Sequence, residues 1–188
     1  MDELTSRFER AVNGFGARVA AVGADQWHLP TPDDGWDVRA LVNHLVVEDL
    51  WAPLLLDGRT IAEVGDRFDG DQLGDDPLAA WSAASAAAVA AAGTQGALER
   101  TVHVSFGDIP GREYLSQLVA DHVIHAWDLA RAVAGDERLD PELVEFVHGS
   151  LAPQADSWRA AGAFGPKVVV ADDADLQTRL LALTGRRV

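Results

Sequence analysis

The sequence has 188 residues, of which 48% are hydrophobic and 24% are charged, a composition typical of a globular domain with a buried core. Asp and Glu (30) outnumber Lys and Arg (15), and the net charge of −15 disfavours binding to nucleic acid or to anionic membrane surfaces. The chain contains no cysteine, so any metal must be held by histidine and carboxylate side chains, and any thiol must come from a small molecule.

The N-terminal segment, MDELTSRFER, is charged and lacks the apolar run of a signal peptide. No later apolar stretch approaches the roughly 20 residues that span a bilayer, so we expect a cytoplasmic protein with no membrane partner. From Asp2 to about Val22, large apolar residues recur every three or four positions. This spacing predicts a first long amphipathic helix.

A second helix is predicted after the proline-rich stretch LPTPDDGW, with Asp37 as its candidate N-cap and its end near Leu56. The inward stripe of this helix carries His44 and Glu48, one turn apart, among apolar residues. An imidazole and a carboxyl group therefore share a face that is expected to point into the core.

Residues 57–76 are rich in Gly and Asp and predict a long crossover connection. Pro77 opens an alanine-rich third helix over PLAAWSAASAAAVAAAGTQGALE, and a short extended segment is expected in TVHVSFGDIPGRE. A fourth helix is predicted from about Arg112 to Val133, with Gly135 ending it.

The rest of the chain predicts small additions, namely a helix broken at Pro153 and a last short helix started by Asp172. Four long helices, one long crossover and very little strand predict an all-α fold, a four-helix bundle with short C-terminal additions. We expect a single domain over residues 1–188, with the bundle core at about 2–135 and the additions at about 136–188.

The fourth helix carries ionisable side chains within an otherwise apolar run, QLVADHVIHAWDLARAVAG. His122 lies in the middle of the apolar stripe, and Asp121, His125 and Asp128 lie along its flank. A buried ionised carboxylate needs a hydrogen bond, an opposite charge or a metal ion to offset its lost hydration. Asp121 and His125, four residues apart, project from one face as two ligands of one ion must.

The polar stripe of the second helix strengthens the metal hypothesis, because bundle metal sites are commonly built from carboxylates and imidazoles on facing helices. His44 and Glu48 are the residues that this helix supplies. A structural interpretation stays open, since a lone core histidine is more often hydrogen bonded than metal bound. Tryptophans within a turn or two of these residues are candidate pocket walls: Trp36, Trp51 and Trp127.

Two segments, GWDVRALVNHLVVE and DHVIHAWDLARAVAG, together resemble the metal-binding proteins of the DinB-like superfamily. The match is to the actinobacterial branch related to the N-terminal domain of mycothiol-dependent maleylpyruvate isomerase, which the ending FGPKVVVADDADLQTRLLALTGR also resembles. The resemblance implies a DinB/YfiT-like bundle that holds a divalent metal, zinc or nickel, with His44, Asp121 and His125 as ligands. Asp121 stands where the isomerase has a glutamate, and His122 falls outside the triad.

The resemblance also implies a function, because three ligands with open coordination positions are typical of a catalytic metal. Our leading hypothesis is a metal-dependent mycothiol transferase or isomerase, in which the metal activates the thiol toward an electrophilic small molecule. Glu48, His122 and Asp128 are then candidates to orient a ligand or to shuttle a proton.

Two alternatives stay open. The first is a non-catalytic bundle in which the polar cluster, with or without a metal, fixes the fold. The second is a metal-dependent hydrolase with Glu48 or Asp128 as the base. Related bundles often pair as homodimers, although no apolar stripe in this sequence requires a second copy.

Overall fold

The computed structural model describes residues 2–188 and divides into two compact units, one ending at Asp136 and the other beginning at Glu137. The elements of the first unit are α1 (Glu3–Val19), α2 (Val38–Leu56), α3 (Ile61–Val64), α4 (Pro77–Ala92), β1 (Thr101–Val104), β2 (Gly107–Pro110) and α5 (Gly111–Ala132). The elements of the second unit are α6 (Pro141–Leu151), η1 (Ala152–Gln154), α7 (Ala155–Ala160) and α8 (Leu176–Leu183).

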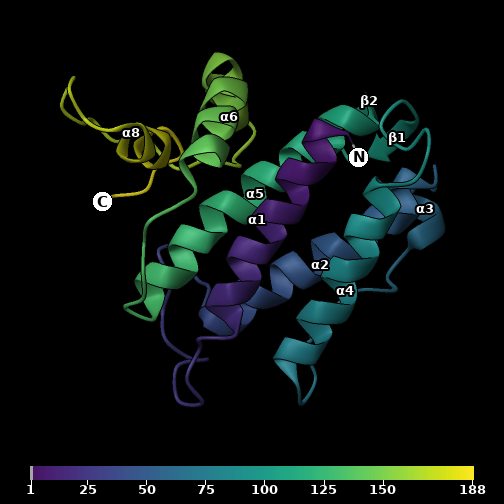
Figure 1. Cartoon of the computed structure of the whole chain (residues 1–188), viewed down its shortest axis with the longest axis horizontal. Coiled ribbons are helices and arrows are strands. Elements are labelled where there is room, and N and C mark those ends of the chain that lie inside the picture. The colour runs from purple at the N-terminus through teal and green to yellow at the C-terminus, as the bar shows by residue number, and fades with distance from the viewer. Residues whose placement is uncertain (1) are drawn as a thin grey trace. The chain divides into compact units, whose positions relative to one another are not determined.

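The long helices of the first unit form the predicted all-α bundle. α1 packs against α5 and α2 packs against α4, and each pair also contacts the other (Figure 1). Arg112 at the start of α5 donates to Asp2 beside the start of α1 at 3.3 Å, so these two helices are parallel. The hydroxyl of Thr5 in α1 donates to the carbonyl of Ala92 at the end of α4 at 3.4 Å, so α1 and α4 are antiparallel.

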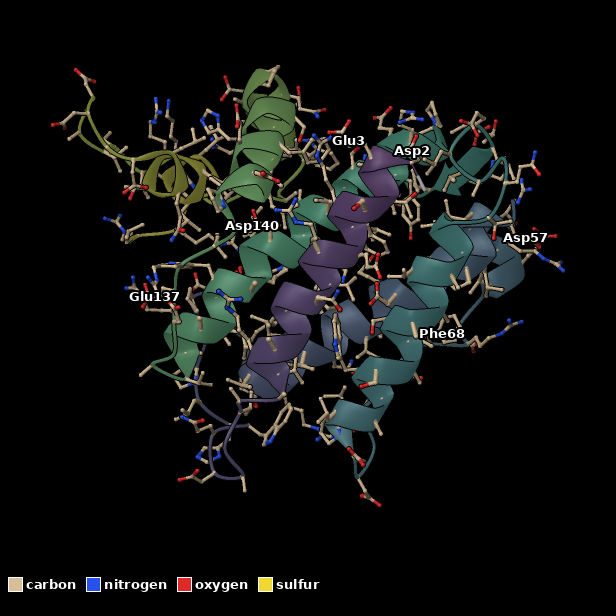
Figure 2. All side chains as sticks on the ribbon, in the orientation of Figure 1. Asp2, Glu3, Asp57, Phe68, Glu137 and Asp140 are labelled. Atoms are coloured by element: carbon tan, nitrogen blue, oxygen red, sulfur yellow. The ribbon has the colours of Figure 1, made fainter. Side chains whose placement is uncertain are left out.

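The long crossover connection is also confirmed. The C-terminal ends of α2 and α4 meet, and Arg100 donates to the carbonyl of Leu56 there at 2.7 Å. Because α2 and α4 are parallel neighbours, residues 57–76 must return along the length of the bundle, and α3 is their one helical turn. Asp2, next to the start of α1, and Asp57, next to the end of α2, lie toward this end of the bundle (Figure 2).

Capping carboxylates determine where several helices begin. Asp37 accepts a hydrogen bond from the backbone of Ala40 at 2.8 Å, so α2 starts where the sequence predicts. The last helix, α8, begins instead after Asp175, whose carboxylate accepts from the backbone of Thr178 at 2.9 Å. The prediction that Asp172 starts this helix was therefore wrong by one turn.

Helix ends agree less closely with the sequence prediction. α1 ends at Val19 rather than near Val22, and α4 ends at Ala92 because the chain turns there toward the antiparallel hairpin of β1 and β2. At the end of α5, the left-handed residue is Ala134, with φ of 55°, and not the expected Gly135. The second unit has the predicted break, since α6 stops at Leu151 before the turn η1.

The core of the bundle is mostly apolar, with fully buried side chains from α1, α2 and α5 that include Phe8, Phe15, Leu41, Leu45, Leu115 and Leu129. The second unit buries apolar residues of its own helices, among them Leu143, Val147, Leu180 and Leu181. Within residues 2–188, no helix is both long and apolar enough to cross a membrane. The single-domain organisation stays a prediction.

Candidate metal centre

Three ionisable residues meet where α2 faces α5. Nε2 of His44 lies 3.0 Å from Oδ2 of Asp121, and Nε2 of His125 lies 3.3 Å from Oδ1 of the same carboxylate. One donor atom from each residue lies within 4.8 Å of the others. The four-residue spacing in α5 places Asp121 and His125 on one face, and α2 supplies His44 opposite them.

This donor set is of a kind that divalent transition-metal ions accept. Two imidazole nitrogens and one carboxylate are ligands that such metals accept. Ligand atoms bound to a tetrahedral zinc ion lie about 3.4 Å from each other. The distances from Asp121 to the two imidazoles, 3.0 and 3.3 Å, are close to that spacing. Three protein ligands would leave coordination positions for a small molecule.

The second ring nitrogen of His125, Nδ1, faces two further carboxylates. Oδ2 of Asp128 lies 2.9 Å from Nδ1, and Oδ2 of Asp33 lies 3.3 Å from it. The side chain of Asp128 is fully buried, whereas Asp33 comes from the loop between α1 and α2 and is 27% exposed. The sequence does not single out Asp33, because a loop residue has no periodic pattern that predicts where it folds.

Trp36 forms one wall of the cluster. Its ring centroid lies 4.9 Å from that of His44 and 5.9 Å from that of His125. The loop that carries Trp36 is closed by a hydrogen bond from the backbone of Thr31 to the carbonyl of Trp36 at 3.0 Å. Gly35 takes the left-handed conformation, with φ of 84°, that this tight turn requires.

The other candidate tryptophans lie elsewhere. Trp51 packs against Phe68 of the crossover connection, with ring centroids 6.2 Å apart. Trp127 is buried under the guanidinium of Arg131, which lies 4.6 Å from its ring centroid. Among the described residues, Trp36 is thus the candidate tryptophan whose ring pairs with imidazoles of the cluster.

Charge coupling is strong within the cluster. Burial raises the pKa of Asp121, but the neighbouring His44 and His125 lower it more, and the net pKa lies well below the usual range. Burial lowers the pKa of His125, but Asp121, Asp128 and Asp33 raise it well above its usual value. Burial and the charge of Asp121 raise the pKa of Glu48, which is half-buried on α2.

His122 belongs to a different buried pair. Its Nδ1 bonds to the carbonyl of Leu118 at 2.8 Å, and its Nε2 lies 3.4 Å from Oδ1 of Asp49. Both side chains are fully buried, and aromatic rings of Phe8, Phe15 and Trp81 pack around the imidazole. Burial lowers the pKa of His122, but Asp49 raises it above the usual value overall.

Asp49 was missed by the sequence analysis, which placed its neighbour Glu48 on the inward stripe. The signal was available, because Asp49 lies four residues after Leu45 and three before Ala52, both fully buried. The buried face of α2 therefore includes Asp49, whereas His44 and Glu48 are only partly buried.

The chain is similar in sequence to one protein family and to two mycobacterial proteins. Residues 8–130, which include His44, Asp121 and His125, match the family described as the mycothiol maleylpyruvate isomerase N-terminal domain. Two proteins of Mycobacterium tuberculosis, named uncharacterized protein Rv0738 (strain H37Rv) and MT0763 (strain CDC 1551), are each 32% identical to this chain over 167 residues. The alignment covers 86% of this chain and 85% of each relative.

Solved structures share the fold. A crystal structure of the mycothiol-dependent maleylpyruvate isomerase and one of its histidine-to-alanine mutant both superpose with a TM-score of 0.67. Their sequence identities to this chain are 17% and 18%, respectively, and the superposition covers 91% of this chain and 75% of each solved chain. At this identity, the likeness establishes the bundle fold alone.

Proposed function

The chain belongs to the mycothiol maleylpyruvate isomerase N-terminal domain family, and from this premise we propose that it is a metal-dependent mycothiol transferase or isomerase. The observation that carries the proposal is the convergence of the two Nε2 atoms of His44 and His125 on the two oxygens of Asp121. The substrate beside the thiol would be an electrophilic small molecule. The name of the related isomerase supports mycothiol as the thiol.

Each residue of the cluster has a defined part in this proposal. His44, Asp121 and His125 would hold zinc or nickel, and Trp36 would form the wall beside the open coordination positions. The bound ion would lower the pKa of a thiol so that the reactive thiolate exists at neutral pH. Because the chain has no cysteine, the attacking sulfur must belong to the bound thiol.

Glu48 is the candidate group for proton transfer. It is half-buried, and burial together with the charge of Asp121 raises its pKa above the usual value of a carboxyl group, the direction of shift that favours general acid–base catalysis. Asp128 is unsuited to that part, because it is fully buried and engaged with Nδ1 of His125. The alternative of a metal-dependent hydrolase would therefore depend on Glu48.

The proposal is tested by thiol consumption. Protein purified without an affinity tag and loaded with zinc or nickel is mixed with mycothiol and an aromatic halide electrophile. We expect ion-dependent conjugation that is lost in His44→Ala and His125→Ala and kept in His103→Ala, whose imidazole lies in the hairpin. Conjugation that continues after chelation and in both His44→Ala and His125→Ala would contradict the proposed metal-dependent function.

Two other outcomes identify the alternatives. A large loss of thermal stability on chelation, with no thiol consumption for any electrophile, would favour a structural bundle. Substrate turnover that needs the ion but not the thiol would favour the hydrolase.

A further inference from the structure

The side of His125 that faces away from the candidate metal site carries the most distinctive arrangement outside the three ligands. Two carboxylates, Asp128 at 2.9 Å and Asp33 at 3.3 Å, approach the single atom Nδ1. Donor atoms of these three residues also lie within 4.8 Å of one another, so the arrangement is either a second cation site or a support for the imidazole.

The chemistry of imidazole favours a support. A carboxylate has only acceptor atoms, so the 2.9 Å bond to Asp128 requires the hydrogen on Nδ1 of His125. With the hydrogen there, Nε2 is the ring nitrogen left to bind a metal ion once its own proton is displaced, and Nε2 lies 3.3 Å from Oδ1 of Asp121. An ion on each ring nitrogen would require an imidazolate anion beside three carboxylates, which is electrostatically unfavourable.

The two carboxylates are held by different elements. Asp128 lies three residues after His125 on α5 and is fully buried, so the helix itself fixes the contact. Asp33 belongs to the closed loop that also carries Trp36 against both imidazoles. The loop thus meets His125 both through a carboxylate and through an aromatic ring.

We propose that Asp128 and Asp33 are positioning residues, which hold the His125 imidazole with its hydrogen on Nδ1 so that Nε2 is directed at the metal. The inference rests on the metal centre of the proposed function. In this inference, Asp33 and Asp128 orient the metal ligand His125 rather than bind a second ion. The loop of residues 31–36 is then part of the metal centre. Carboxylates that orient a metal-bound histidine typically change metal affinity 10- to 100-fold when they are removed.

The test measures the zinc dissociation constant and the number of zinc ions per chain for the full-length protein and three variants. Asp128→Asn keeps the side-chain shape and removes the charge, and Asp33→Asn does the same on the loop. Asp108→Asn is the matched control, because Asp108 contacts Nδ1 of His103 at 2.7 Å in the hairpin. Circular dichroism checks that each variant is folded. If Asp128→Asn does not fold, Asp33→Asn still tests the inference, because Asp33 is partly exposed.

We expect one zinc ion per chain throughout, about 10- to 100-fold weaker binding in Asp128→Asn, a smaller loss in Asp33→Asn and no change in Asp108→Asn. In the zinc-bound wild type, the proton–nitrogen correlation spectrum of the imidazoles should show the hydrogen of His125 on Nδ1. A carboxylate with a purely structural part would not determine which nitrogen of His125 carries the hydrogen.

Several results would overturn the inference. Two zinc ions per chain, with one lost in Asp128→Asn, would make the cluster a second metal site. One zinc ion with unchanged affinity in both folded variants would refute positioning while leaving the proposed function intact. A wild type that binds no zinc or nickel would refute the metal centre itself, and the positioning role with it.

Discussion

Asp121 contacts two imidazoles because a carboxylate has two oxygens that can each face a separate partner. One oxygen lies 3.0 Å from His44 and the other 3.3 Å from His125. The side chain of Asp121 remains 31% exposed, so the cluster is open to solvent on one side.

The charge coupling at these residues predicts a pH dependence of metal binding. Without metal, burial lowers the pKa of His125 but its carboxylate neighbours raise it well above its usual value, so the imidazole holds its proton more tightly than a free histidine does. The ion must displace that proton, and zinc affinity should therefore fall as the pH is lowered, with about one proton released per ion near pH 7. Titration calorimetry in buffers of different ionisation enthalpy measures this release. Affinity that is independent of pH from 6 to 8 would contradict the assignment of His125.

At the scale of elements, the bundle depends on close approach between α1 and α4. A Cβ atom added to Gly16 would lie 2.6 Å from Nε1 of Trp81, whereas one added to Gly14 would meet nothing within 4 Å. Trp81 is only 3% exposed and packs on Phe15 with ring centroids 4.8 Å apart, so it has little room to move. The packing of Trp81 therefore leaves no room for a larger side chain at position 16, whereas no neighbour restricts position 14.

This difference predicts opposite effects on stability. Gly16→Ala should lower the free energy of unfolding by about 1–3 kcal/mol through overpacking. Gly14→Ala should raise it by about 0.5–1 kcal/mol, because alanine loses less backbone entropy in a helix. Urea unfolding of both variants measures the effects. Equal changes in the two variants would contradict the packing of Trp81 against α1.

The buried pair of His122 and Asp49 links α5 to α2 and predicts strong coupling between the two side chains. Removing one partner leaves a buried charge uncompensated, so His122→Leu or Asp49→Leu should each cost about 3–5 kcal/mol. The double variant should cost much less than the sum, since both buried charges are then gone. Urea unfolding of the four proteins in chelator measures the coupling, and additive losses would show that the pair does not interact.

At the scale of the whole molecule, acidic residues dominate the electrostatics. The net charge of −15 over 188 residues means that like charges repel one another in the folded state. Salt screens this repulsion, with a Debye length of about 10 Å at 0.1 M. We therefore predict that the melting temperature rises when sodium chloride is raised from about 20 to about 300 mM. A melting temperature that falls with salt would show that specific ion pairs outweigh the general repulsion.

How far the sequence predicts this molecule depends on whether a residue lies in a periodic segment. The four long helices and the crossover follow from helical spacing and from caps such as Asp37. His44, Asp121 and His125 stay candidate ligands, selected because polar residues interrupt apolar stripes on two helices and because the family resemblance implies these three. Asp33 could not be found in this way, since the fold of a loop depends on contacts distant in sequence. The left-handed residue after α5 is Ala134 rather than Gly135. A glycine favours the left-handed conformation at a helix end, but local packing determines which residue adopts it.

The most direct test of the metal centre is an anomalous difference map from a crystal grown with zinc or nickel and measured at the absorption edge of the ion. The account predicts one strong peak at about 2.0–2.2 Å from Nε2 of His44, Nε2 of His125 and a carboxylate oxygen of Asp121. A peak between Asp33 and Asp128, a peak on His122, or no peak in this part of the bundle would contradict it.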